Sequence, residues 1–439
     1  MTRFISLRET EKKPMMKSKS YEKIGETVYT GTLPNGLTVI VVPKPGFKEG
    51  YAVFATSYGG ACRRFKLDGV WYDTPAGVAH FLEHKMFDMP DGDNALSTLS
   101  KNGAQPNAFT SSDTTAYYFG CSTGFEENLR MLLRFVSTPY FTEESVAKEQ
   151  GIIGQEIGMG DDDPYRTGYY AMLNLLYEHN PVKEEVAGTV ESIAEITPET
   201  LYACHAAFYN PKNMVLCVAG DFDPERIYEI AQEEVGDKEG SKPAVDMGEA
   251  ESAYPLGTYA EERMEVSAPQ FFVGAKVTPV PTGEELFRQK IVAQLALRTV
   301  FGSSGKFYNK LYSEGLLNRD YGYEMDYVAG TATVIFEGES RDPQAVLAEL
   351  KAAVAEVREK GIDPEFFARM KKASFGSRLR GLESFDSLCL AQMDGYFEGY
   401  EALDSFEILE SIELAECEKF ISDYLADEKL VLSVILPMK

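Results

Sequence analysis

Three side chains near residue 80 could together bind a metal ion and activate water. His80, Glu83 and His84 are spaced i, i+3 and i+4, so in a helix all three project from one face. Two imidazoles one turn apart can bind one Zn²⁺ at about 2.0–2.1 Å each. A carboxylate beside them could accept a proton from water at the metal's open position. The chain has 4 histidines, and two of them fall in this one turn.

The surrounding residues predict the helix that this chemistry requires. Asp73 or Thr74 can act as the N-cap, and Pro75 suits the first helical turn. An apolar stripe on the side away from the polar residues consists of Val78, Ala79, Leu82 and Met86. A buried helix whose polar groups are merely satisfied by neighbours is the alternative. The glutamate in the order H-x-x-E-H favours metal chemistry.

The composition sets limits on the class of protein and on its partners. A chain of 439 residues predicts two or three domains, and 44% hydrophobic residues predict a globular protein. The 43 basic and 69 acidic residues leave a net charge of −26, which repels nucleic acids and anionic membranes. Such a charge suits basic or amphipathic peptides, although an acidic surface can also serve solubility alone.

The sequence predicts a cytoplasmic protein. Its 6 cysteines form no C-x-x-C pair, which indicates small buried side chains in a reducing compartment. The N-terminal stretch has no uninterrupted apolar segment and carries acidic residues, unlike signal and transit peptides. A membrane span needs about 18 consecutive apolar residues, and the sequence contains no such window.

A long acidic helix downstream offers carboxylates for the same ion. Thr142 is its expected N-cap, and the helix is predicted from Glu143 to Glu156. Glu149 and Glu156 are seven residues apart and share one face. One of them could bind the ion and the other could orient an imidazole. The spacing does not distinguish which one binds.

A run rich in Thr, Tyr and Phe, residues 106–119, predicts two strands joined around Ser112 and Asp113. A strand close to a metal site could bind an extended peptide through main-chain hydrogen bonds. An ordinary sheet strand is the alternative.

The order of elements predicts a duplicated chain. We expect a first domain at residues 20–236, a linker at 237–256 and a second domain at 257–439. The buried strand predicted at the end of the first domain has a counterpart at the end of the second. The second domain has no histidine, so we expect it to keep the architecture without the metal. His179 and His205 have no partner at metal spacing, and we interpret them as structural.

These residues resemble the pitrilysin/insulinase family of inverzincin zinc peptidases, above all its short, two-domain bacterial members. The resemblance rests on His80-Phe-Leu-Glu-His84, on Glu156 within residues 149–157, and on Asn107-Ala-Phe-Thr110 followed by Thr115-Ala-Tyr-Tyr118. It runs from about Thr27 to the C-terminus and is more specific in the first half.

The resemblance implies one Zn²⁺ per chain, held by His80, His84 and Glu156. Glu83 would then be the general base, and Glu149 an outer carboxylate. The gap from His84 to Glu156 is a few residues shorter than is usual in the family.

The resemblance also implies a substrate strand and a fold. Asn107, Ala108 and Phe109 would form the edge strand that pairs with the substrate backbone. The fold would be α+β, with two homologous domains that each pack helices on a mainly antiparallel sheet. The whole chain would form half of a clamshell chamber.

One departure from the family pattern concerns the second domain. Active members usually carry an Arg seven residues before a Tyr, which hold the substrate and stabilise the oxyanion. At the matching positions this chain has Tyr312 and Arg319, with the two residue types exchanged. Either the exchanged pair serves, or a partner subunit supplies the usual residues, which is the alternative we favour. We therefore expect a homodimer, or a heterodimer with a metal-free homologous subunit.

The expected function is zinc-dependent endopeptidase activity on peptides or small unfolded polypeptides, basic ones among them, inside an enclosed chamber. A second hypothesis is a non-catalytic or partner-dependent subunit of a heterodimeric processing peptidase. A third is a metal-free peptide carrier whose histidine pair is accidental.

Overall fold

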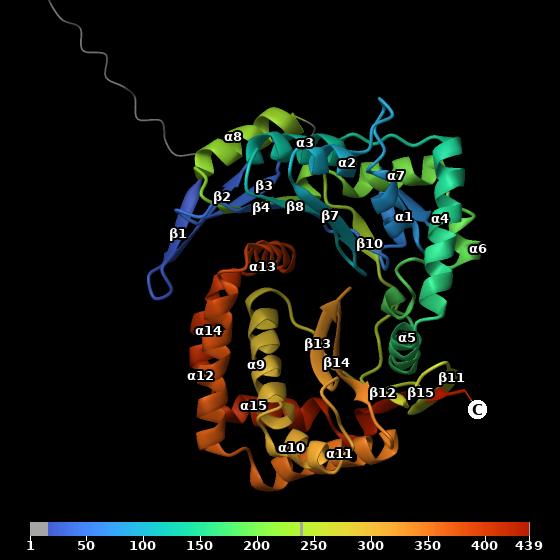
Figure 1. The fold of residues 1–439 in the computed structure, drawn as a ribbon, viewed down its shortest axis with the longest axis vertical. Helices are drawn as coiled ribbons and strands as arrows, with labels where there is room; N and C mark the ends of the chain where they lie inside the picture. The colour runs from blue at the N-terminus through green and yellow to red at the C-terminus, as the bar shows by residue number, and fades with distance from the viewer. Residues whose placement is uncertain (1–15, 238–239, 439) are drawn as a thin grey trace, which may run out of the picture.

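The computed structural model describes residues 16–237 and 240–438, which form two α+β halves, as the fold class predicted (Figure 1). The first half contains β1 (Lys17–Tyr21), β2 (Glu26–Thr32), β3 (Thr38–Pro43), β4 (Gly50–Thr56), β5 (Arg64–Leu67), β6 (Val70–Asp73), α1 (Val78–Lys85), α2 (Ala95–Lys101), β7 (Gln105–Thr110), β8 (Thr115–Cys121), α3 (Phe125–Ser137), α4 (Glu143–Asp161), α5 (Pro164–Leu176), α6 (Val190–Ile193), α7 (Pro198–Phe208), β9 (Met214–Gly220) and α8 (Pro224–Val235). After β10 (Ala244–Asp246), the second half contains β11 (Tyr259–Met264), β12 (Gln270–Lys276), α9 (Gly283–Phe301), α10 (Lys306–Ser313), β13 (Gly322–Val328), β14 (Thr331–Glu339), α11 (Pro343–Lys360), α12 (Pro364–Gly381), α13 (Phe385–Glu398), α14 (Ser405–Ser411), α15 (Leu414–Tyr424) and β15 (Val431–Pro437).

The two main sheets share one topology. The first is seven-stranded in the order β1-β2-β3-β9-β4-β8-β7, and the second is five-stranded in the order β11-β15-β12-β14-β13. In each sheet one pair is parallel, β3 with β9 and β11 with β15, and the strands that follow in the order are antiparallel. Strands β3-β9-β4-β8-β7 therefore correspond one by one to the second sheet. This match confirms that the two domains are homologous.

Each half lends a helix to the other half's sheet. Helix α5 packs on β12 and β15, and α13 packs on β4 and β9 (Figure 1). The two helices are equivalent, because each is the third helix after the matching strand, β8 or β14. Gly168 allows the close approach of α5, since a Cβ there would lie 2.3 Å from the Phe272 ring. This reciprocal packing joins the two halves through shared apolar cores.

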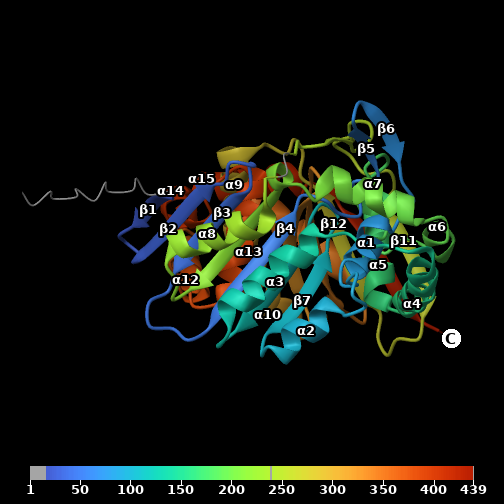
Figure 2. The ribbon, with the colours of Figure 1, turned by 90° about the horizontal axis from the view of Figure 1, so that it is seen from above.

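The start of α1 differs from the prediction. Its N-cap is Gly77 and no side chain caps it, so the expected caps Asp73 and Thr74 were wrong. Asp73 instead ends β6, which pairs with β5 across an Asp68-Gly69 turn with positive φ at both residues. Gly77 has φ 90°, and a Cβ there would lie 2.4 Å from the carbonyl oxygen of Ala187. Backbone packing therefore sets the start of this helix. Figure 2 shows β5 and β6 at the end of the molecule that carries α1.

The expected domain and linker bounds also differ from the structure. The first strand begins at Lys17, before residue 20, where the first domain was expected to begin. Helices α6 and α7 are separate, because Thr197 and Pro198 start a new helix at α7. The expected linker contains β10, which pairs with β5.

The cysteines and helices bear on the predicted location. All 6 cysteines are buried free thiols, in keeping with their interpretation as small core side chains. Within residues 16–237 and 240–438, no helix combines the length and the apolar character needed to cross a membrane. A cytoplasmic location stays a prediction.

The packing of α13 on the first sheet makes a stability prediction. Leu388 on α13 is 3% exposed in the core it shares with β4 and β9. We expect Leu388→Ala to lower the free energy of unfolding by about 2–5 kcal/mol, because it leaves a cavity between the halves. The control is Leu379→Ala on α12, where the side chain is 43% exposed. Urea unfolding followed by circular dichroism checks this, and equal effects of both variants would contradict the packing role.

Candidate metal centre

Two helices bring three potential ligands together. His80 and His84 lie on α1, Glu156 lies on α4, and the two helices pack against each other. The His80 Nε2 atom is 3.5 Å from Glu156 Oε1, and His84 Nε2 is 3.6 Å from Glu156 Oε2. One ligand atom from each of these residues can be chosen so that all three lie within 4.8 Å of one another. The carboxylate therefore faces both imidazoles.

These distances fit a zinc ion. Ligand atoms around a tetrahedral zinc with bonds of about 2.0–2.1 Å lie about 3.3–3.4 Å apart. The separations of 3.5 and 3.6 Å approach that value and stand at the long limit of a direct hydrogen bond. Two imidazole nitrogens and a carboxylate are also the donor types that zinc prefers. The donor set fits zinc in both chemistry and spacing.

Glu149 contacts His84 from the opposite side of the ring. Its Oε1 is 3.1 Å from His84 Nδ1, and its Oε2 is 3.4 Å from the buried Lys85 Nζ. Lys85 in turn lies 2.5 Å from Asp88 Oδ2. With Nδ1 donating to Glu149, the Nε2 lone pair of His84 faces Glu156. The geometry thus separates the two glutamates that the spacing left equivalent: Glu156 faces both rings, and Glu149 orients one.

The electrostatics of the centre favour a bound cation. Burial alone would lower the pKa of His84, but the Glu149 hydrogen bond and the surrounding carboxylates raise it overall. Burial would raise the pKa of Glu149, yet the bond to His84 and the charge of Lys85 lower it. The His80 imidazole, followed by the charges of His84 and Arg166, lowers the pKa of Glu156 against the effect of burial. Both glutamates are therefore ionised at neutral pH.

Glu83 and the predicted substrate strand meet beside this centre. Glu83 is 7% exposed, and its Oε2 accepts a 2.6 Å hydrogen bond from Thr110 Oγ1. Thr110 ends β7, the edge strand of the first sheet, which packs against α1. The structure thus places the segment Asn107–Phe109, with Asn107, Ala108 and Phe109 in β7, next to the metal-binding helix.

The structure does not bring Tyr312 and Arg319 to this centre. Tyr312 lies on α10, is 47% exposed and stacks on Tyr308 with ring centroids 5.6 Å apart. Arg319 follows α10 and is also exposed. Figure 1 shows α10 at the end of the second half that faces away from α1. Within one chain, these two residues and the histidines remain apart.

The other two histidines have structural surroundings. His205 is buried, with Nε2 3.2 Å from the Val136 carbonyl oxygen and its ring stacked on Tyr209. His179 Nε2 lies 3.6 Å from Glu178. Neither belongs to the candidate metal group found among the described residues.

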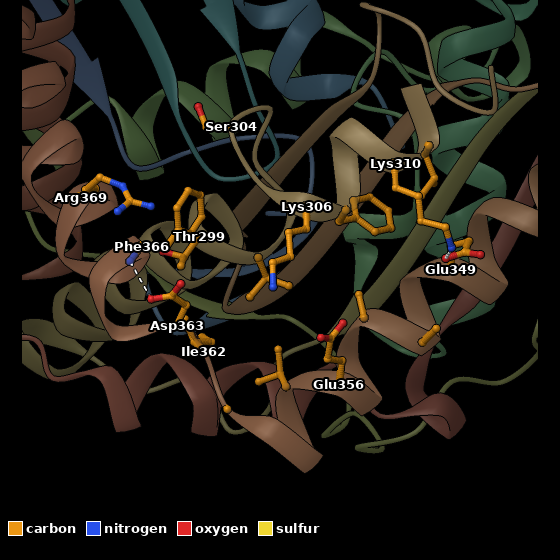
Figure 3. Close-up of a pocket in the computed structure, with 17 residues that line it drawn as sticks. Thr299, Ser304, Lys306, Lys310, Glu349, Glu356, Ile362, Asp363, Phe366 and Arg369 are labelled. Carbon is orange, nitrogen blue, oxygen red and sulfur yellow. Dashed lines mark hydrogen bonds and ion pairs between the residues drawn. The ribbon is translucent and has the colours of Figure 1, made fainter. Parts of the chain in front are cut away.

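A cavity of about 530 Å³ in the second half contains none of the predicted site residues (Figure 3). It lies between α10, α11 and α12, and Lys310 in its wall is bound to Glu349 at 2.6 Å. Asp363 caps α12 by accepting two backbone N–H groups. These charged groups already have partners within the protein, and the cavity contains no histidine.

Two residues that contact the glutamates of this centre were not predicted from the sequence. Lys85 contacts Glu149, and the signal for it was a charged residue directly after His84 on a helix predicted to bury an apolar stripe. Thr110 ends the Asn107-Ala-Phe-Thr110 motif. Its contact with Glu83 could not be predicted, because the two residues are far apart in the sequence.

Comparisons with known proteins show which family the chain belongs to. A family model described as "Insulinase (Peptidase family M16)" matches residues 68–190, and one described as "Peptidase M16 inactive domain" matches residues 195–374. A Bacillus subtilis relative, described as the uncharacterized zinc protease YmfH, is 36% identical over 432 residues, covering 96% of this chain and 100% of the relative.

Two solved structures share the fold. An M16-like peptidase from Alicyclobacillus acidocaldarius has a TM-score of 0.90 and 32% identity, covering 99% of this chain and 100% of that one. A protease from Helicobacter pylori has a TM-score of 0.81 and 18% identity, covering 97% of this chain and 100% of that one.

The contact between Glu149 and His84 makes a prediction about zinc affinity. Glu149→Gln removes the charge that orients His84, so we expect the dissociation constant for zinc to rise about 10–100-fold. The control is Glu144→Gln, an exposed acid in the first turn of the same helix. Competition with a chromogenic chelator measures both variants. An unchanged affinity in Glu149→Gln would show that the contact does not support metal binding.

Proposed function

Because the chain belongs to the M16 peptidase family, which includes insulinase and pitrilysin, we propose that it is a zinc-dependent endopeptidase that cuts peptides and small unfolded polypeptides. One observation carries the proposal: His80, His84 and Glu156 converge, with Glu83 on the same helix face. A metal-free carrier would have no need for this arrangement.

The residues of the centre would have three different roles. His80, His84 and Glu156 would hold a zinc ion, which supplies a Lewis acid for the peptide carbonyl and increases the acidity of water. Glu83 accepts the proton of the attacking water and then gives it to the leaving amine. Glu149 keeps His84 in the orientation that presents Nε2.

The edge of the first sheet supports binding of extended peptides. Strand β7 ends the seven-stranded sheet and pairs only with β8 in the sheet order. The outer edge of Asn107–Phe109 could therefore pair with an extended chain, if a substrate carbonyl oxygen replaces Asn107 Oδ1, which now accepts from the Ala108 N–H at 2.9 Å. Main-chain pairing requires an extended segment and does not depend on substrate side chains. This suits unfolded polypeptides.

An acidic cavity supports the proposal that basic peptides are among the substrates. It measures about 540 Å³, lies between the two halves and begins beside Phe109. Its walls include Asp326, Asp394 and Glu398, while its lining lysine, Lys290, is already paired with Glu398. Burial, followed by the charge of Glu398, raises the pKa of Asp394 to about 6. A basic side chain would relieve this repulsion.

A second subunit is part of the proposal. Tyr312 and Arg319 stand apart from the metal centre, so one chain does not present the usual oxyanion-binding pair there. We propose that a partner closes the chamber: a metal-free homologue would supply the usual pair, and a second copy would supply its exchanged Tyr312 and Arg319. A partner-dependent or non-catalytic subunit is the second candidate, favoured by the exchange at these two positions.

The role of Glu83 predicts a separation of binding from chemistry. We expect Glu83→Gln to keep one zinc per chain and to lose at least about 100-fold in kcat, because the amide cannot accept the proton. Metal analysis and digestion of equal-length peptides of graded charge measure both effects, and we expect basic peptides to be cut faster by the wild type. Hydrolysis by Glu83→Gln at the wild-type rate would refute the assignment of the base.

The partner proposal predicts that activity depends on assembly. We expect the rate per zinc site to rise when the chain dimerises or when a co-purifying homologue is added, because the oxyanion pair then reaches the centre. Light scattering gives the assembly state, and peptide digestion at the same concentrations gives the rate. Full activity of the isolated monomer would show that no partner is needed.

A further inference from the structure

Thr110 connects the edge strand to the candidate general base. It is the last residue of β7, and its Oγ1 lies 2.6 Å from Glu83 Oε2. Within residues 16–237 and 240–438, the side-chain hydrogen bond to the Glu83 carboxylate comes from Thr110. The strand expected to hold the substrate and the residue expected to move the proton are therefore in direct contact.

The direction of this hydrogen bond follows from its neighbours. The Thr110 hydroxyl donates to Glu83 Oε2. The hydroxyl of Thr115, 3.3 Å from Thr110 Oγ1, donates instead to the Tyr58 carbonyl oxygen at 2.8 Å. A distance of 2.6 Å makes the bond to Glu83 a short O–H···O hydrogen bond.

The turn after Thr110 is fixed by backbone hydrogen bonds. Ser111 N–H donates to the Thr114 carbonyl oxygen at 2.8 Å, closing the turn between β7 and β8. Gly60 N–H donates to the Ser111 carbonyl oxygen at 2.9 Å, and Ala61 N–H to that of Ser112 at 2.8 Å. The hydroxyl is therefore held in place by the sheet before any substrate arrives.

We propose that Thr110 is a positioning residue that orients Glu83 for proton transfer. The bond to Oε2 stops rotation of the carboxylate, which is otherwise a soft torsion, and leaves Oε1 for the proton of the reacting water. Because Thr110 belongs to β7, the strand that would pair with the peptide also sets the orientation of the base. This inference rests on the proposed endopeptidase function.

Paired substitutions test the role of the hydroxyl. Thr110→Val keeps the β-branched shape and the strand preference but removes the donor. We expect kcat to fall about 10–100-fold, with KM within about twofold and one zinc per chain retained, since only orientation of the base is lost. Thr110→Ser keeps the donor and should restore kcat to within about threefold of the wild type.

The control lies on the equivalent sheet of the second half. Thr331 on β14 donates its hydroxyl to the Val328 carbonyl oxygen at 2.8 Å, so Thr331→Val removes a comparable strand hydroxyl that bonds to the backbone rather than to Glu83. We expect this variant to keep the wild-type kcat. If Thr110→Val lowers kcat and Thr110→Ser lowers it as much, the effect is structural. That result would overturn the positioning role.

Crystal structures of the zinc-loaded wild type and Thr110→Val give a readout that does not need activity. We expect one Glu83 carboxylate orientation in the wild type and a rotated or split one in Thr110→Val. An unchanged Glu83 in Thr110→Val would overturn the inference. If Thr110→Val keeps kcat while Glu83→Gln loses it, only this inference fails. If the wild type cuts no peptide, the proposed function fails, and the orientation of Glu83 still decides the role of Thr110.

Discussion

The placement of two imidazoles between two ionised carboxylates is the interaction on which the metal centre depends. Glu156 faces the Nε2 atoms of His80 and His84, while Glu149 holds the far side of His84. Two ionised carboxylates around two imidazoles favour a bound cation. The bonds to the histidines lower the pKa values of both glutamates, and the charge of Lys85 adds to this effect at Glu149. The packing of α1 on α4 creates this arrangement, and the buried Lys85 keeps Glu149 in place within it.

A helix from each half covers the sheet of the other half. Because α13 covers β4 and β9 while α5 covers β12 and β15, neither sheet is buried by its own half alone. The two halves are therefore packed against each other, and a cavity lies between them. That cavity begins beside Phe109 and is lined by carboxylates, so the end of the edge strand opens into negative potential. The strand proposed to bind substrate therefore ends at the boundary between the two halves.

The second half repeats the fold of the first half without the histidines of the candidate metal centre. Its sheet repeats the strand order of the first, yet it has no histidine, and α10 carries Tyr312 on its exposed surface away from α1. The first half contains the candidate metal ligands and base, while groups for the oxyanion are not beside them. The distance of Tyr312 from α1 is the observation behind the proposed partner.

The sequence by itself determined the local features, because helical spacing and capping act over one or two turns. His80, Glu83 and His84 share a face by periodicity alone, Thr142 caps α4 as predicted, and the duplicated order of elements was visible. It did not determine the start of α1, where Gly77 packs against the Ala187 backbone, nor the contact of Thr110 with Glu83. Residue spacing left Glu149 and Glu156 equivalent and only the family resemblance indicated Glu156, which the structure places opposite both rings. Tertiary structure alone decided that α5 and α13 each pack on the other half's sheet. These outcomes depend on how distant elements pack, and residue spacing carries no information about that.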